Sequence, residues 1–256
     1  MTLLEVILGV VVGITAGVLS GLFGVGGGIV MTPGVQHLLG AAPIVALATP
    51  LPVILPTALA GALRYRGSGE VDARAAMWMA STGIVTSALG AEATDHVPTH
   101  LLLVVTAMLL AWQSIGVLRG GGPRRGAAGS PPSVVAFASI GAVAGFVSGL
   151  LGVGGGIVMV PLMVRWLGMP LKRALGTSLA AIVLLVIPGS VVHALKGNID
   201  WAMGMALALG AIPGARIGSA LALGAKERSL RLAVGGFLLA VAAVYGISET
   251  LALIRA

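Results

Sequence analysis

Two nearly identical glycine-rich stretches, GLFGVGGGIVMTPG from Gly21 and GLLGVGGGIVMVPL from Gly149, stand 128 residues apart. Glycine holds a regular helix poorly, because each one costs up to about 1 kcal/mol relative to alanine. A helix that restarts after such a break offers unpaired N–H groups and a positive dipole end, and both favour an anion. The candidate anion-binding positions are Gly26, Gly27, Gly28, Ile29, Gly154, Gly155, Gly156 and Ile157.

The glycines have two other interpretations, a nucleotide-binding loop and a bend that serves packing. A nucleotide-binding loop is disfavoured, because no Lys-Ser or Lys-Thr pair follows either stretch and the flanks are apolar. A bend that only serves close packing remains an alternative for the central glycines. The outer glycines recur every four residues, which is typical of helix–helix contacts through small side chains; they are Gly9, Gly13, Gly17 and Gly21, and Gly141, Gly145 and Gly149.

Hydroxyl side chains near the breaks are further candidates for contacts with an anion. Thr49, Thr177 and Ser178 carry hydroxyl groups, and Ser20 and Ser148 stand just before the two breaks. Hydroxyls in membrane helices also bond to their own backbone, so a purely structural role is the alternative for each of them.

Arg216 lies inside a predicted membrane segment, where a charge usually faces a cavity or a partner. A guanidinium fork suits the oxygens of a sulfonate or carboxylate, so Arg216 is a candidate substrate contact. Pairing with backbone carbonyls or reaching toward the membrane face are the alternatives. Asp72 and Asp200 precede helical stretches and are interpreted as N-caps, and His193 is interpreted as a packed or interfacial residue.

The composition indicates the class of protein in which these residues occur. The 256-residue chain is 57% hydrophobic and 9% charged, whereas an ordinary soluble domain is about a quarter charged. Its continuous apolar runs approach the ~20 residues that cross a bilayer as a helix, which predicts an all-α polytopic protein in a lipid bilayer. The net charge of +7 is scattered in short clusters and does not predict nucleic-acid binding. Without cysteine, thiolate chemistry is excluded, and we expect no metal, cofactor or catalytic residue.

Ten apolar segments are predicted, five in each half of one transmembrane domain. They span residues 3–20, 22–39, 43–64, 73–94 and 97–119, then 133–151, 153–167, 171–196, 200–224 and 228–253. Residues 1–119 form the first copy of a repeat, 120–132 a polar linker, and 133–256 the second copy. Between Gly17–Gly34 and Gly145–Leu162, 13 of 18 positions are identical.

The basic residues predict the orientation of the two copies. Cytoplasmic loops collect Lys and Arg; with the linker inside, 12 of the 15 basic residues fall on the cytoplasmic side. Equivalent loops of the two copies then lie on opposite sides, so the repeats are inverted. Each copy must cross the membrane an odd number of times. Five full spans meet this condition, and so do three spans plus a re-entrant hairpin formed by the first two segments.

The doubled stretch GxxGVGGGxxxxP resembles the TauE/SafE family of sulfite exporters and related anion permeases. LGTSLAAI (175–182) and GAIPGARIGS (210–219) resemble two further stretches of that family, and the likeness covers nearly the whole chain. In the first copy the equivalent stretch reads LATPLPVI, so Pro50 replaces the serine at 178. The resemblance implies membrane transport of a small anion such as sulfite, sulfoacetate or a related organosulfur or carboxylate compound.

The predicted function is therefore secondary transport of such an anion across the bacterial cytoplasmic (inner) membrane, not enzymatic catalysis. The two copies would move against each other to give alternating access, with H⁺ as a candidate co-ion. An anion-selective channel is the alternative, since the same dipoles would select anions in an open pore. The sequence leaves the substrate, the direction of transport and the oligomeric state open.

Overall fold

The computed structural model describes residues 2–93, 97, 107–108, 111–112, 114–116, 118, 133–152 and 154–255. The first copy contains α1 Leu3–Phe23, α2 Gly28–Pro33, the π-helix η1 Gly34–Leu38, α3 Pro43–Ala48, α4 Pro50–Gly67 and α5 Ala73–Ala93. The second copy contains α7 Val134–Leu151, α8 Gly156–Trp166, α9 Leu171–Leu195, α10 Trp201–Gly224 and α11 Glu227–Arg255. The predicted linker 120–132 and most of the predicted segment 97–119 lie outside the described residues.

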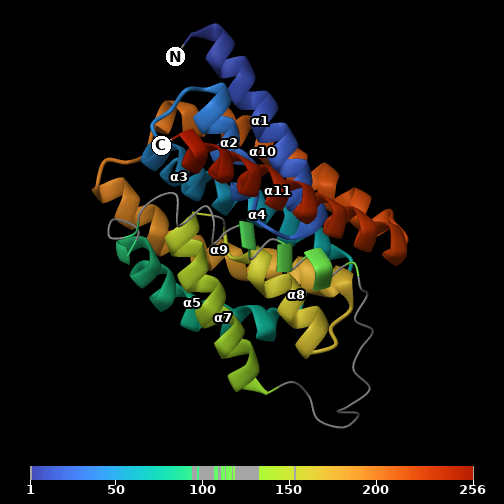
Figure 1. The fold of residues 1–256 in the computed structure, drawn as a ribbon. Helices are drawn as coiled ribbons and strands as arrows, with labels where there is room; N and C mark the ends of the chain where they lie inside the picture. The colour runs from blue at the N-terminus through green and yellow to red at the C-terminus, as the bar shows by residue number, and fades with distance from the viewer. Residues whose placement is uncertain are drawn as a thin grey trace.

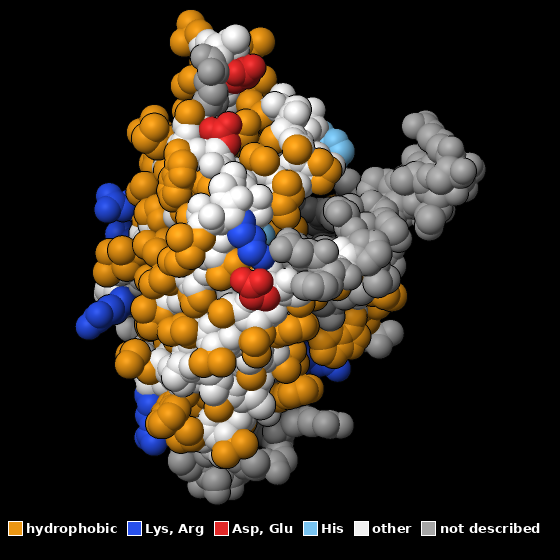
Figure 2. All heavy atoms as spheres, turned by 90° about the vertical axis from the view of Figure 1, so that its left-hand side faces the viewer, with side chains coloured by type: hydrophobic (Ala, Val, Ile, Leu, Met, Phe, Trp, Pro, Cys, Tyr) orange, Lys and Arg blue, Asp and Glu red, His pale blue; other side chains and the backbone are white. Residues whose placement is uncertain are grey.

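Most of these helices have the length and composition of membrane spans. Five candidate spans occur in the described part of the chain: Leu3–Phe23, Pro43–Gly67, Val134–Leu151, Leu171–Leu195 and Trp201–Gly224. Figure 2 shows one face of the molecule on which hydrophobic side chains predominate and charged ones are few. A surface of this kind fits lipid rather than water, and the predicted all-α polytopic membrane fold is confirmed.

Two helix starts show how the sequence sets the helix boundaries. The Asp72 carboxylate accepts a hydrogen bond from the Ala75 N–H at 3.0 Å, and the Asp200 carboxylate accepts one from the Met203 N–H at 2.9 Å. Both residues therefore cap the first turn of a helix, α5 and α10, as the sequence predicts.

The first two helical segments of each copy form a hairpin. After α1 the chain turns at the glycines, and α2 with η1 returns along α1, since a Cβ built on Gly34 would lie 2.6 Å from a Val12 methyl carbon. This returning leg has 11 residues, 6 in α2 and 5 in η1, and α8 has 11 as well. At 1.5 Å per residue, each leg covers about 16 Å, roughly half of the hydrocarbon core. Each returning leg is therefore shorter than a full span, whereas α1 and α7 are long enough to be candidate spans.

The glycines spaced by four residues lie at helix contacts that join one copy to the other. Cβ atoms built on Gly13 and Gly17 of α1 would meet the backbone of α10, and those on Gly141 and Gly145 of α7 would meet the backbone of α5. The prediction of close packing through small residues is confirmed at these positions. The first helix of each copy thus packs against the fourth segment of the other copy.

These contacts between the copies divide the described helices, apart from α11, into two bundles. The first bundle consists of α1, α2, η1, α3, α4 and α10, which share a core that includes Val12, Met31, Val53 and Leu207. The second bundle consists of α5, α7, α8 and α9. In Figure 1 the first bundle lies mainly in the upper part of the molecule and the second bundle mainly in the lower part. The helices α4 and α9 face each other where the bundles meet.

Three loops that the sequence predicts to be cytoplasmic come together at one end of the molecule, here called the basic end. Lys172 donates a hydrogen bond to the Leu223 carbonyl at 2.6 Å, which joins the starts of α9 and of the α10–α11 loop. Arg173 pairs with Asp72 at 3.1 Å, which joins α9 to the α4–α5 loop. The helices α5 and α9 end at the opposite end, where Lys196 pairs with Glu92 at 3.3 Å.

Candidate functional site

The glycine-rich stretch of each copy forms the tip of its hairpin, and the helix is broken there. Gly27 precedes α2 with φ 87°, and Gly155 precedes α8 with φ 71°, and neither helix start has a side-chain cap. Residues with a Cβ rarely adopt such positive φ values. The glycines therefore permit the turn, and the Gly156 N–H at the start of α8 donates to the Gly154 carbonyl at 2.9 Å.

The two tips lie at mid-depth. A Cβ built on Gly26 would lie 3.0 Å from Ile54 and 3.4 Å from Ile182. These isoleucines occupy the central turns of the candidate spans Pro43–Gly67 and Leu171–Leu195. Broken backbone at this depth is tolerated where protein buries it or where it lines a cavity. The predicted positions Gly26 to Ile29 and Gly154 to Ile157 are thus brought together in the middle of the protein.

The tips touch each other directly. The Ser178 hydroxyl donates a hydrogen bond to the Gly24 carbonyl at 2.9 Å, and a Cβ built on Gly156 would lie 2.7 Å from the Val25 Cα. The cavity beside this contact has a volume of about 10 Å³, with mainly apolar walls that include Phe23, Val25 and Ile157. That volume is near the minimum for one water molecule, so an anion enters only if the tips separate.

Two buried serine hydroxyls lie against the breaks. Ser20 is 1% exposed and Ser148 is 0% exposed, and within the described ranges neither hydroxyl has a hydrogen-bond partner. Cβ atoms built on Gly27 and Gly155 would lie 3.4 Å from Ser20 Cβ and 3.3 Å from Ser148 Cβ. Buried polar groups are nearly always hydrogen-bonded, and Thr32 and Ser87 are also without a partner in the described ranges; only Ser20 and Ser148 occupy the same position in both copies.

The predicted hydroxyls on α9 and between α3 and α4 bond backbone groups of the other copy. Thr177 accepts a hydrogen bond from the Asp72 N–H at 2.9 Å, and Thr49 accepts one from the Asp200 N–H at 3.1 Å. Each threonine thereby fixes the loop that leads into α5 or α10. Their contact with a substrate, and that of Ser178, stays a prediction beside this structural role.

Arg216 lies apart from the tips. Its side chain is exposed on α10, whereas the neighbouring Ala215 is buried against Gly21. The sequence predicts Arg216 deep in a membrane segment, and the structure places its side chain on the outward face of α10. A substrate contact by Arg216 stays a prediction.

The structure gives Ser20 and Ser148 more weight than the sequence analysis does. Sequence reasoning places them beside the breaks but does not distinguish them from the other hydroxyls. The sequence does contain a pattern that distinguishes these serines, because each copy has a serine at the same distance before its glycines. The site as built offers backbone N–H and hydroxyl donors, which bind anions, and these donors come from two hairpins that face each other.

This architecture defines a class, a polytopic helical membrane protein with two broken hairpins that meet in its interior. The sequence profile described as "Sulfite exporter TauE/SafE" matches residues 9–245, and the chain belongs to this family of membrane transporters. It is a multi-pass protein of a bacterial cell membrane.

Curated relatives carry compatible names. The chain is 30% identical over 224 residues to the "Probable membrane transporter protein YunE" of Bacillus subtilis, covering 78% of this chain and 82% of the relative. It is 28% identical over 248 residues to a "Probable membrane transporter protein" of Xylella fastidiosa, covering 94% and 95%. No solved structure gives a significant match.

Proposed function

We propose that the protein is a secondary transporter that carries a small anion, sulfite or an organic sulfonate or carboxylate, across the cytoplasmic membrane by alternating access. The observation that carries the proposal is the meeting of two broken hairpins at mid-depth, each with a buried serine hydroxyl without a partner in the described residues. Two kinds of donor would hold the anion: the N–H groups that begin α2 and α8, and the hydroxyls of Ser20 and Ser148.

The closed contact between the tips supports a transport cycle rather than an open pore. A cavity of about 10 Å³ does not pass sulfite, so the tips would separate toward one side and then toward the other. An inverted relation of the two copies would explain how the tips open toward either side, since α1 and α7 lead to the tips from opposite ends of the molecule (Figure 1).

The packing of the helices changes which bodies are proposed to move. The two sequence copies cannot slide past each other as units, because α1 is packed through glycines on α10, and α7 on α5. We propose instead that the first bundle moves against the second, with α4 and α9 at the contact between them. The contact between the bundles includes the backbone of the tips, where a Cβ built on Gly156 would lie 2.7 Å from the Val25 Cα, so this movement requires the tips to separate.

Transport by purified protein in proteoliposomes tests the function. Radiolabelled sulfite should enter with saturation, and unlabelled sulfite inside the vesicles should accelerate entry by counterflow. Sulfoacetate, isethionate, taurine, sulfate and simple carboxylates, added as competitors, define the substrate class. Flux that rises linearly with concentration and shows no counterflow would favour the anion channel instead.

Engineered disulfides test the moving bodies, and the chain contains no cysteine of its own. A Cβ built on Gly61 of α4 lies 3.9 Å from Leu179 Cγ of α9, so Gly61→Cys with Leu179→Cys would link the two bundles. Gly9→Cys with Ala206→Cys is the matched control within the first bundle, where the two Cβ atoms lie 3.0 Å apart.

Oxidation should stop transport by the variant that carries Gly61→Cys and Leu179→Cys, and reduction of the disulfide should restore transport. The control pair should transport in both states. If the Gly9–Ala206 link stops transport and the Gly61–Leu179 link does not, the proposed division into bundles is wrong.

A further inference from the structure

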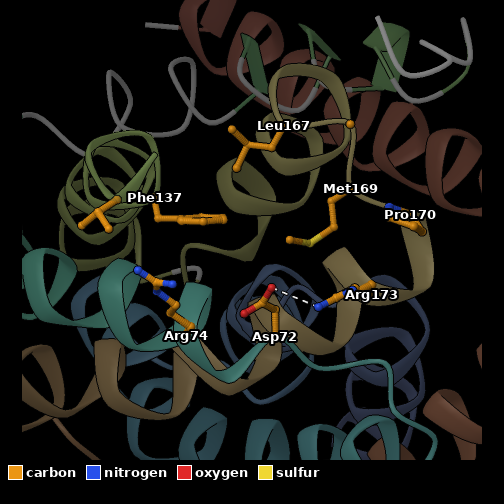
Figure 3. Close-up of a pocket in the computed structure, with 9 residues that line it drawn as sticks. Asp72, Arg74, Phe137, Leu167, Met169, Pro170 and Arg173 are labelled. Carbon is orange, nitrogen blue, oxygen red and sulfur yellow. Dashed lines mark hydrogen bonds and ion pairs between the residues drawn. The ribbon is translucent and has the colours of Figure 1, made fainter. Parts of the chain in front are cut away.

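A second, larger cavity, separate from the tips, opens at the basic end of the molecule. It has a volume of about 420 Å³ and lies among the starts of α5, α7 and α9 and the α8–α9 loop. Figure 3 shows Arg74 and Arg173 on either side of Asp72, with Phe137, Leu167 and Met169 across the cavity from them. We call it the basic cavity.

The charges of the basic cavity favour an anion. Arg173 pairs with Asp72 at 3.1 Å, and the Asp72 carboxylate also accepts the Ala75 N–H. Arg74 takes part in none of the ion pairs found among the described residues. One guanidinium is thus left without a counter-charge, and a carboxylate or sulfonate is the group that it binds best.

Three helix N-termini reinforce this positive charge. The helices α5, α7 and α9 begin at Ala73, Val134 and Leu171, and residues within two positions of each start line the cavity. Each N-terminus carries the positive end of a helix dipole, which acts over about the first turn. The side walls made by Phe137, Leu167 and Met169 are apolar, so a small organic anion would find both a charged and an apolar surface.

A short chain of contacts joins the basic cavity to the tips. The Asp72 N–H donates to the Thr177 hydroxyl at 2.9 Å, and the next residue, Ser178, donates to the Gly24 carbonyl at 2.9 Å. Asp72 lines the cavity and Gly24 belongs to the first tip. On α9, Arg173 at the cavity and Ile182 beside the first tip are nine residues apart, so a ligand in the basic cavity lies about 14 Å along α9 from the proposed transport site.

The equivalent place in the other copy has lost the arginines. At the offset of 128 residues, Asp72 corresponds to Asp200, but Arg74 corresponds to Ala202 and Arg173 to Val45. The acidic residue is kept and both cations are missing, so the net charge of these three positions changes from +1 to −1. The two ends of the transporter would therefore differ in their attraction for an anion.

We propose that the basic cavity is a binding site for small carboxylate or sulfonate anions, which loads the transport site from the basic end. The loading role rests on the proposed function, whereas the binding of an anion in the basic cavity does not. A single loading site on one side makes the apparent affinity for the substrate different at the two faces of the membrane.

Quenching of tryptophan fluorescence by iodide measures the anion concentration in the cavity directly. Leu167→Trp places a reporter in the basic cavity, and Leu39→Trp places one at the equivalent position of the other copy, with the four native tryptophans replaced by Phe. Iodide quenching, divided by quenching with neutral acrylamide, should be about threefold stronger at position 167 than at 39 at low salt.

The arginine variants tie this enrichment to the cavity. Arg74→Gln should lower the iodide-to-acrylamide ratio at position 167 about threefold, and Arg74→Lys should keep it, because the charge remains. The ratio at position 39 should not change in either variant. Equal ratios at the two positions, or a ratio at 167 that does not respond to Arg74→Gln, would overturn the proposed site.

Lipid composition separates a soluble anion from a lipid headgroup. The same quenching is measured in nanodiscs of phosphatidylcholine and in nanodiscs that also contain phosphatidylglycerol. Enrichment that persists with phosphatidylglycerol supports a site for soluble anions. Loss of enrichment would show that a headgroup phosphate occupies the cavity and would overturn the loading role.

Sided transport then tests loading. Proteoliposomes with the protein in known orientation receive radiolabelled sulfite on one side, and Arg74→Gln should raise KM about threefold only when sulfite is presented to the basic end. Equal increases on both sides, or none, would overturn the loading role. If the unmodified protein moves no sulfite, the proposed function fails for this substrate, while the iodide result still decides the anion site.

Discussion

Replacement of Gly27 by alanine tests whether the backbone of the tip binds the anion. Gly27 has φ 87°, and a Cβ there would lie 3.2 Å from the Ala16 carbonyl oxygen. An L-residue in this conformation costs about 1–2 kcal/mol, and the contact demands a shift of a few tenths of an ångström. The tip relieves this strain by rotating its N–H groups away from the positions that bind an anion. Since 1.4 kcal/mol is a factor of ten, we expect Gly27→Ala to weaken anion binding about tenfold.

Gly40→Ala is the matched control, because it carries the same backbone cost at a place remote from the tips. Gly40 has φ 67°, and a Cβ built there meets nothing within 4 Å. Gly40→Ala should lower the free energy of unfolding by about 1–2 kcal/mol, measured by thermal unfolding in detergent, and Gly27→Ala should lower it by less, because rotation of the tip relieves the strain. Titration calorimetry with sulfite, or with the best-binding anion of the competitor series, should show reduced affinity for Gly27→Ala alone. Normal affinity in Gly27→Ala would refute a backbone site.

Further substitutions separate binding from structure. Ser20→Ala and Ser148→Ala should each weaken anion binding about tenfold, because a hydrogen bond to a charged group contributes about 1.5–3 kcal/mol, yet leave the thermal midpoint unchanged; a lower midpoint with normal affinity would assign the hydroxyls a structural role. Tyr65→Phe should show the reverse, since it removes the bond of 3.0 Å to the Gly21 carbonyl and should cost about 1 kcal/mol of unfolding free energy in calorimetry. Arg216→Ala should weaken binding more than Arg228→Ala if the arginine of α10 contacts the substrate, and equal affinities in the same titration would remove it from the site.

The helical architecture and the position of the breaks could be predicted from local sequence signals. The apolar runs gave the membrane class, and Asp72 and Asp200 marked the starts of α5 and α10 correctly. The glycines of the doubled stretch adopt the positive φ values that their type permits. Each of these features depends on residues that are neighbours in the chain, so the pattern of residue types was sufficient.

The partners of the hydroxyl groups and the basic cavity could not be predicted in the same way. Thr177 bonds a residue 105 positions away and Ser178 bonds one 154 positions away. Such contacts depend on how the two copies interlock, and spacing along one segment does not contain that information. For Arg216, the sequence predicted the depth in the segment. It did not predict the face of α10 on which the side chain lies.

Each copy contributes its fourth segment, α5 or α10, to the bundle that holds the first helix of the other copy, and this packing constrains how the protein is synthesised and assembled. A ribosome that has finished only the first half has produced α1 with its small-residue face bare, because the helix that fits this face is still to be synthesised. Either half expressed alone would therefore be left open and prone to degradation, whereas the two halves supplied together from separate genes would complete each other. Assembly in the membrane must wait for nearly the whole chain, and the buried centre forms only when both ends of the polypeptide have been inserted.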